Sequence, residues 1–131
     1  MIFIDADAFV ALALPQDNNH SRAVAVSEDI RLRKEQLITS MLSFGETITV
    51  ISQKGGREKA LQFIDKFLVS NTVVVEADTA LQEEGILVYR TQTSKNVSFT
   101  DCANMAIMQR EKIKEIFSFD RIYKKNGFKL L

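Results

Sequence analysis

Short apolar runs alternate with longer segments of helical periodicity along this chain, beginning with Ile2-Phe3-Ile4. Several runs are β-branched or aromatic, and none strictly alternates with polar residues, which is typical of strands covered on both faces. We interpret five runs as strands, at residues 2–4, 37–38, 72–75, 115–119 and 128–130. Strands that alternate with helices predict an α/β fold with a mostly parallel five-stranded sheet.

Apolar residues keep a helical spacing between these runs. Pro15 stops the first such segment, and Gly55-Gly56 ends the third, so that the third and fourth form a helical hairpin. The predicted helices are 7–14, 20–34, 41–53, 57–69, 79–93 and 99–112. Neither a repeat nor a low-complexity tract interrupts the series, and we expect residues 1–131 to form one domain.

The amino-acid composition says more about where the protein is located than about what it does. The 17 basic and 17 acidic residues give zero formal net charge, so an RNA would have to meet a local basic patch, such as 54–59, 90–95 or 121–125, or a metal ion. The lone Cys102 cannot form an intramolecular disulfide, and we expect it to be buried rather than nucleophilic. The chain start lacks the basic segment and cleavage pattern of a signal peptide. We therefore expect a cytoplasmic protein with no membrane contact.

Acidic side chains follow two of the predicted strands directly. Asp5 follows the first strand, Asp120 follows the fourth, and Asp101 lies at the start of the last long helix. Ligands of an open α/β sheet bind beyond the carboxyl ends of its strands. If the first and fourth strands are neighbours, all three acids therefore reach the same edge of the sheet.

Glu46 is a fourth candidate, within the helix 41–53. Its neighbours one turn away are Leu42 and Val50, so we expect it on a partly buried face, where a cation would relieve the cost of its charge. Mg²⁺ and Mn²⁺ prefer carboxylate and water oxygens, and a site of Asp and Glu suits them better than zinc. The lone His20 is not needed and is expected at the surface.

Each acid also has a purely structural interpretation. Asp101 fits the third helical position of a capping box that Ser98 opens, although capping does not exclude metal binding. Asp7 fits the N-cap or the first turn of the first helix. Asp120 fits a turn, and Glu46 fits an exposed helix position. The residues alone leave these alternatives open.

Four motifs, taken in order, resemble those of the PIN domain family. They are FIDADAF with the first acid, SFGETITVI with the helical glutamate, VSFTDCANMAIM with the third acid and IFSFDRIY with a closing [ST]-x-D-x-x-[FY] element. The resemblance covers essentially the whole chain. It implies a PIN-like three-layer α/β/α fold around a five-stranded parallel sheet.

The resemblance also implies an activity. Small single-domain members are usually VapC-type toxins, which are ribonucleases that hydrolyse RNA phosphodiester bonds by metal-activated water, form homodimers and bind a neutralising antitoxin. Carried over by position, Asp5 and Asp101 are direct ligands of Mg²⁺ or Mn²⁺. Ser118 and Asp7 are supporting residues, Asp7 less securely because the family often has a polar residue there. The implied catalytic acids are Asp5, Glu46, Asp101 and Asp120.

Two other functions stay open. Asp5-Ala6-Asp7 after a strand also resembles the opening of haloacid-dehalogenase-type phosphatases, in which the first aspartate is the nucleophile. That class needs a further acidic pair, a Ser or Thr after a second strand, and a lysine. Ser40 is the candidate for the hydroxyl, and Lys112 is the candidate lysine. The second alternative is a PIN-like interaction module for RNA or protein that lacks catalysis. Such a module would be favoured if one of the four acids were missing, and none is.

Overall fold

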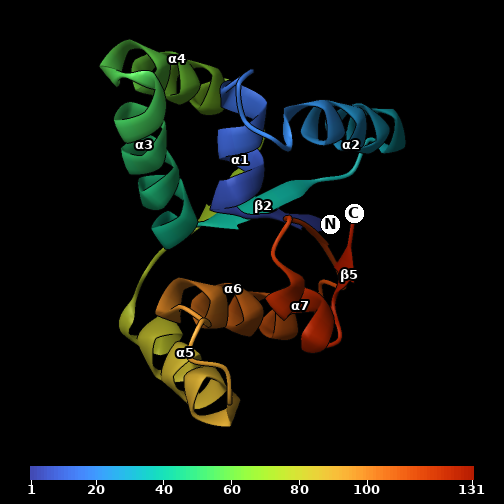
Figure 1. The fold of residues 1–131 in the computed structure, drawn as a ribbon. Helices are drawn as coiled ribbons and strands as arrows, with labels where there is room; N and C mark the ends of the chain where they lie inside the picture. Colours follow the sequence, from blue (N-terminus) through green and yellow to red (C-terminus); the bar gives the residue numbers. More distant parts are fainter.

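A computed structural model describes all residues 1–131 and contains one sheet of five parallel strands (Figure 1). The strands are β1 (Ile2–Ile4), β2 (Leu37–Ser40), β3 (Val73–Val75), β4 (Glu115–Phe117) and β5 (Lys129–Leu130). Their order is β3-β2-β1-β4-β5, with Ile4 opposite Phe117. The predicted α/β/α fold is confirmed, and β1 and β4 are the neighbours that a shared acidic edge requires.

Seven helices connect and cover the strands. They are α1 (Ala6–Ala13), α2 (His20–Arg33), α3 (Met41–Gly55), α4 (Arg57–Leu68), α5 (Thr79–Thr91), α6 (Phe99–Arg110) and α7 (Arg121–Lys125). The first six lie within about two residues of their predicted bounds, whereas α7 was not predicted because five residues are too few to show a helical period. None of the helices is both long and apolar enough to cross a membrane.

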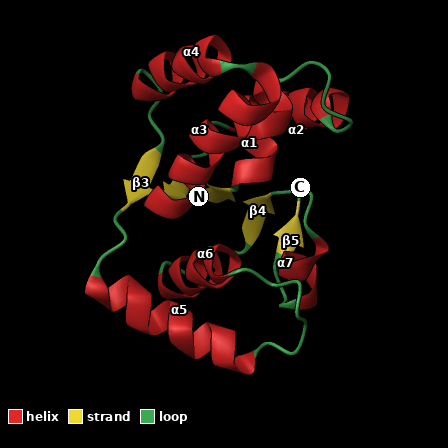
Figure 2. Ribbon diagram, turned by 60° about the vertical axis from the view of Figure 1, so that its left-hand side comes forward, coloured by secondary structure: helices red, strands yellow, loops and turns green.

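The helices form two layers with the sheet between them. Figures 1 and 2 show α1 to α4 on one side of the sheet and α5 to α7 on the other. Successive side chains of a strand point to opposite faces. Accordingly, Ile2 and Ile4 pack with the first layer, and Phe3 packs with the second. Each face of the sheet therefore has its own hydrophobic core.

Aromatic rings hold the α3–α4 hairpin against α1. Phe63 and Phe67 of α4 pack against each other and against Phe9 and Phe44, with ring centroids 4.5–6.1 Å apart. At the turn of the hairpin Gly56 has a φ of 94°, a conformation that glycine adopts without steric cost. The hairpin thereby fixes the direction of α3, whose first turns reach the carboxyl end of β1.

Polar residues extend β2 beyond its predicted end. Thr39 and Ser40 continue the strand and are fully buried. The Thr39 hydroxyl donates to the carbonyl oxygen of Ile4 at 2.7 Å, and the Ser40 hydroxyl donates to Oδ1 of Asn104 at 2.7 Å. These hydrogen bonds satisfy polar atoms that a hydrophobicity pattern assigns to a loop.

A substitution at Leu81 tests the packing of α5 on α6. Leu81 is 1% exposed, and Leu81→Ala is expected to lower the free energy of unfolding by about 2–5 kcal/mol because it leaves a cavity. Leu68, which is 72% exposed, is the control, and Leu68→Ala should change stability by no more than about 0.5 kcal/mol. Urea unfolding measures both, and equal effects would contradict this packing.

Candidate active site

Asp5 lies at the carboxyl end of β1 and is the N-cap of α1. Its carboxylate is only 6% exposed, and its Oδ1 accepts a hydrogen bond from the amide of Ala6 at 2.8 Å. A buried carboxylate is costly unless donors surround it. Oδ1 also faces Ser43 Oγ (3.1 Å) and Asn104 Nδ2 (3.1 Å), and Oδ2 faces Ser118 Oγ (3.3 Å) and Tyr123 Oη (2.9 Å). Four side chains distant in sequence therefore hold this carboxylate.

Asn104 is the centre of that hydrogen-bond network, and sequence reasoning missed it. It is fully buried on α6, where its Nδ2 lies 2.9 Å from Ser43 Oγ and 3.0 Å from Tyr123 Oη. Its Oδ1 accepts from Ser40 at 2.7 Å. The sequence does contain a signal, because Asn104 is the single amide in a stretch of α6 that is otherwise apolar and buried, 102–108. Buried amides require partners, and here the partners surround Asp5.

Tyr123 connects two of the predicted metal ligands. Its hydroxyl oxygen lies 2.9 Å from Asp5 Oδ2 and 3.4 Å from Asp101 Oδ1. Burial and the negative charges of Asp5 and Asp101 hold the pKa of Tyr123 well above its ordinary value, so the hydroxyl stays a donor. The last position of the [ST]-x-D-x-x-[FY] element thus orients the first acid of the site.

Asp101 is both a capping residue and a member of the site. The capping box is present, because the Asp101 amide donates to Ser98 Oγ at 3.0 Å and the Ser98 amide donates to Asp101 Oδ2 at 2.8 Å. Oδ1 is not used by the box and faces Tyr123. The two interpretations of Asp101 are therefore compatible in one side chain.

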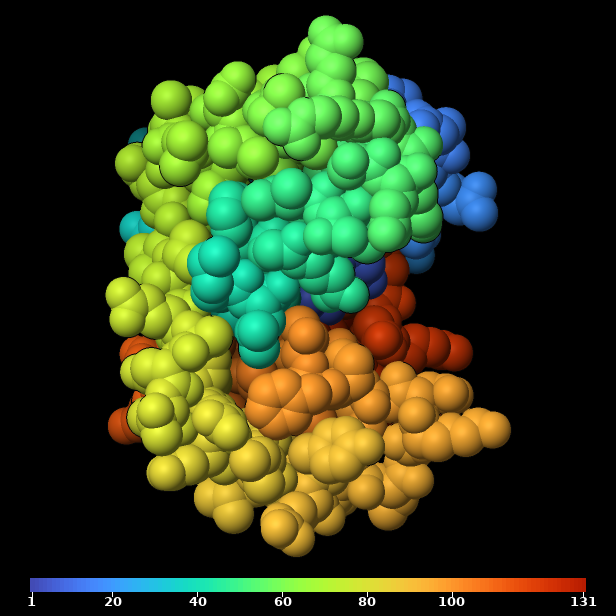
Figure 3. Space-filling view, turned by 90° about the vertical axis from the view of Figure 1, so that its left-hand side faces the viewer, coloured from blue at the N-terminus to red at the C-terminus, as the bar shows by residue number.

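Glu46 is exposed, which agrees with the structural interpretation of it and contradicts the partly buried face that its apolar neighbours suggested. The buried positions of α3 are Ser43, Thr47 and Ile51, so the helix is rotated relative to the orientation that the apolar neighbours suggested. The Glu46 carboxyl nevertheless lies near the other acids. Partial desolvation raises its pKa, and the charges of Asp5 and Asp101 raise it further. Figure 3 shows the first residues of the chain (dark blue) deep between α3 (teal) and α6 (orange).

Asp7 is a first-turn residue of α1, and Asp5 takes the N-cap position that was one of the two expected for Asp7. Oδ2 of Asp7 accepts from the amide of Phe119 at 2.8 Å and from Ser118 Oγ at 3.1 Å. Oδ1 is buried without a hydrogen-bond partner. Burial and the charge of Asp5 raise the pKa of Asp7 to about 7. The side chain thus ties α1 to the segment after β4.

Asp120 stands apart from the other acids. It is exposed, and its Oδ1 accepts from the amide of Ile122 at 2.9 Å as the N-cap of α7. No hydrogen bond joins its carboxylate to Asp5 or Asp101. Its own amide donates to Ser118 Oγ at 3.1 Å. Ser118 Oγ therefore contacts the carboxylates of Asp5 and Asp7 and the backbone amide of Asp120.

The donor chemistry of this edge suits a hard divalent cation. Burial and the charge of Asp101 raise the pKa of Asp5, and Glu46 is raised in the same sense. A cation would offset this repulsion, and its preferred ligands are oxygens of this kind. No group of three Asp, Glu, His or Cys side chains is positioned to share one ion. The Tyr123 hydroxyl connects the carboxylates of Asp5 and Asp101 instead.

A larger pocket lies away from these acids. Its volume is about 780 Å³, and it is lined from α2, α4 and the start of β2 by residues that include Ile30, Leu37, Phe63 and Phe67. None of the four candidate acids lines it. We therefore do not assign the chemistry of the carboxylates to this pocket.

A parallel sheet in the order β3-β2-β1-β4-β5, with acids at its carboxyl edge, defines an α/β domain of the PIN type. The PIN domain family matches residues 2–129, and the chain belongs to this family. Among known proteins it is similar to the 23S rRNA-specific endonuclease VapC20 of two Mycobacterium tuberculosis strains, with 27% identity over 98% of this chain and 95% of that protein.

A solved structure confirms the fold. The crystal structure of Mycobacterium tuberculosis VapC20, described as a sarcin-ricin loop cleaving toxin, matches with a TM-score of 0.85 and 23% identity. The match covers 98% of this chain and 96% of that one. The resemblance to the PIN domain family is confirmed by the family match over residues 2–129.

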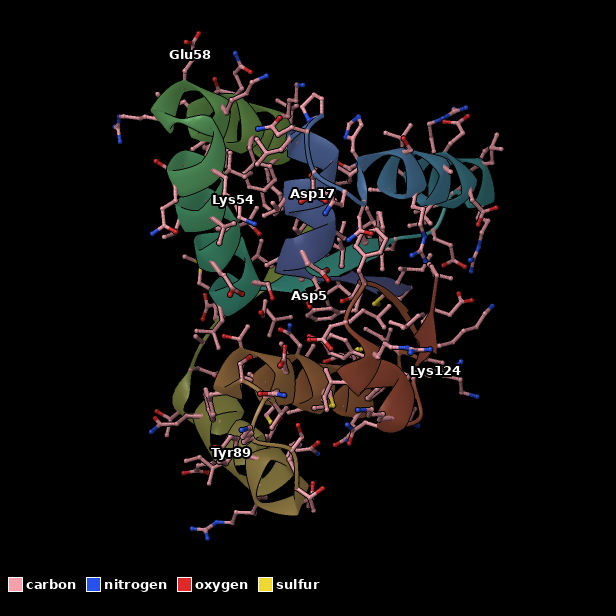
Figure 4. The ribbon with its side chains drawn as sticks, in the orientation of Figure 1. Asp5, Asp17, Lys54, Glu58, Tyr89 and Lys124 are labelled. Carbon is pink, nitrogen blue, oxygen red and sulfur yellow. The ribbon has the colours of Figure 1, made fainter.

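Removal of one hydroxyl tests the hydrogen-bond network. Tyr123→Phe preserves the ring but takes a donor from the buried Asp5 carboxylate, and we expect a loss of about 1–3 kcal/mol in the free energy of unfolding. Tyr89→Phe is the matched control, because Tyr89 is 52% exposed on α5 (Figure 4) and should change stability by less than about 0.5 kcal/mol. Chemical denaturation compares them, and a neutral Tyr123→Phe would contradict the network.

Replacement of Asp7 by asparagine tests its raised pKa. The folded state binds this proton more tightly than the unfolded chain, so the wild-type free energy of unfolding falls as pH rises from about 4 to about 7. Asp7→Asn has no such proton to lose. Between pH 4 and pH 7 its free energy of unfolding should therefore fall by at least about 1 kcal/mol less than that of the wild type. Urea unfolding in EDTA at several pH values measures it. Glu58→Gln, at the exposed end of α4 (Figure 4), should follow the wild type; an Asp7→Asn profile parallel to both would refute the assignment.

Proposed function

We propose that this protein is a metal-dependent endoribonuclease of the VapC toxin type. One observation carries the proposal, namely that the Tyr123 hydroxyl joins the carboxylates of Asp5 (2.9 Å) and Asp101 (3.4 Å) at the carboxyl edge of one sheet. The similarity to VapC20, a 23S rRNA-specific endonuclease, supports RNA as the substrate.

In this proposal Asp5 and Asp101 hold Mg²⁺ or Mn²⁺ through carboxylate oxygens. Such a cation, when bound, supplies a Lewis acid for water and for the charge that gathers on the phosphate. Tyr123 and Asn104 donate to the Asp5 carboxylate and keep it in one orientation, so that little rearrangement is needed when the substrate arrives. Glu46 is exposed, so that its carboxyl can meet a water molecule or the RNA from solvent.

Asp120 and Ser118 complete the proposed set. Asp120 Oδ1 caps α7, while its other oxygen makes no hydrogen bond, so capping leaves one oxygen for a water molecule or a second ion. Ser118 supports Asp5 and Asp7 through its hydroxyl. These assignments rest on position in the PIN motifs and on the contacts described above.

Three further parts of the proposal follow from the resemblance to VapC-type toxins. They are a homodimeric state, a cognate antitoxin protein as partner and a location in the cytoplasm. The family and its similarity to VapC20 support them.

The phosphatase alternative has less support. Ser40 is fully buried, and its hydroxyl is engaged by Asn104. Lys112 precedes β4, so it lies at the amino edge of the sheet rather than at the carboxyl edge with Asp5. The candidate lysine therefore lies away from the aspartate, and the candidate serine makes no hydrogen bond to it.

Cleavage of RNA tests the proposed function. The purified protein, incubated with a structured RNA and separately with a phosphomonoester, is expected to cleave only the RNA, with Mg²⁺ or Mn²⁺ and not with EDTA. Asp5→Asn should lower the rate by at least about a hundredfold, because it removes a charge that would hold the cation. Gel electrophoresis of the RNA and release of phosphate are the two measurements.

Further variants separate the acids from one another. Asp17→Asn, in the loop after α1 and away from the carboxyl edge (Figure 4), should retain activity. Asp120→Asn preserves a good N-cap, so a loss of activity there would reflect the site rather than folding. Turnover of the phosphomonoester alone would refute the nuclease, and inactivity toward both substrates would favour a binding module.

A further inference from the structure

A second pocket opens beside the carboxylates, between α2, the segment after β4 and the C-terminal strand. Its volume is about 560 Å³. Ser118 belongs both to this pocket and to the group of side chains that contact Asp5 and Asp7. The pocket is lined by Arg22, Phe119, Arg121, Lys124, Phe128 and Lys129, among others. It is therefore rich in cations and adjoins the proposed active site.

Three of these cations have no acidic partner. Lys129 pairs with Glu115 at 2.7 Å, but no ion pair involves Arg22, Arg121 or Lys124. All three side chains are exposed. Most other arginines of the chain behave differently, since Arg31, Arg33 and Arg110 each pair with a glutamate. Unpaired cations around one pocket provide a local positive field in a chain whose net charge is zero.

Aromatic packing connects this pocket to the acids. The Arg22 guanidinium lies over the ring of Phe119, 5.2 Å from its centroid, and Phe119 stacks edge-on against Phe117 at 6.1 Å. The amide of the same Phe119 donates to Asp7 Oδ2. One residue therefore orients a cation of the pocket on one side and a carboxylate of the site on the other.

We propose that this pocket binds the sugar-phosphate backbone of the RNA strand next to the bond that is cleaved. The assignment rests on the proposed ribonuclease function, and it adds the surface that holds the substrate. A phosphodiester anion matches guanidinium and ammonium groups, whereas the carboxylate edge alone repels it. Arg121 and Lys124 are the principal contacts, and Arg22 contributes from α2.

The basic segment 54–59 is less suitably placed. Lys54 lies at the far end of α3, eleven residues beyond Ser43, which is about 16 Å along a helix axis. Figure 4 shows Lys54 well above Asp5, and Lys124 on the side of α7. Arg57 begins α4, farther still along the hairpin. A strand held there would not reach the acids through adjacent nucleotides.

RNA binding without cleavage tests the proposal. The probe is a fluorescein-labelled oligouridylate of about 12 nucleotides, titrated by anisotropy in EDTA at several salt concentrations. The double variant Arg121→Gln/Lys124→Gln is expected to bind about tenfold more weakly. The slope of log affinity against log salt should fall by up to about 1.4, at roughly 0.7 for each phosphate contact. Lys54→Gln/Arg57→Gln removes the same charge and should bind within about twofold of the wild type.

The outcomes distinguish this proposal from the nuclease proposal. The pocket assignment would be overturned if both double variants bound the oligouridylate equally weakly, or if neither bound it more weakly than the wild type. This holds even if the wild type cleaves RNA. Selective weakening would support the pocket even if cleavage were absent. Displacement of the oligouridylate by polyglutamate at the same charge concentration would show a general anion site and would also overturn it. Circular dichroism melting checks that both variants, which alter only exposed side chains, are folded.

Discussion

The burial of the Asp5 carboxylate is the constraint on which the rest of the structure depends. A charged oxygen in a nearly closed site is tolerated only with donors around it. Those donors come from α3, α6, the end of β4 and α7, through Ser43, Asn104, Ser118 and Tyr123. Both helical layers and two strands must therefore be in place before Asp5 is satisfied. The elements of the fold thus meet at Asp5, which is also the first metal ligand of the proposed function.

The same arrangement leaves electrostatic repulsion that the chain does not relieve by itself. Hydrogen bonds from Ala6 and Tyr123 lower the pKa of Asp5, but burial outweighs them, and the net shift is upward. Asp7 and Glu46 shift in the same direction. Buried carboxylates that also repel one another are typical of functional sites, where stability is lower than it could be. A bound divalent cation would stabilise the charged form of each carboxylate. Relief of the repulsion would then contribute to the free energy of cation binding.

Sequence patterns predicted what depends on local periodicity and on position after a strand. They gave the five strands, six helices and the acids at the ends of β1 and β4, and the parallel order made β1 and β4 neighbours. They left open whether Glu46 is exposed or partly buried, because that depends on the rotation of α3, and they did not predict the role of Asn104. Asn104 bonds to Ser40 and Ser43, which are 64 and 61 residues away in sequence. No local pattern encodes such a pairing, because it exists only after both layers pack on the sheet.

The short helix α7 has a larger role than its length suggests. Neighbouring residues of a helix point about 100° apart, so one turn has distinct inner and outer faces. Its inner face buries Ile122 and Tyr123 against α6 and the carboxylates, and its outer face exposes Arg121 and Lys124 toward the basic pocket. Because Asp120 begins the helix as its N-cap, the same acid sets the direction of both faces. A change that rotates α7 would therefore alter both the orientation of Asp5 and the proposed binding of RNA by Arg121 and Lys124.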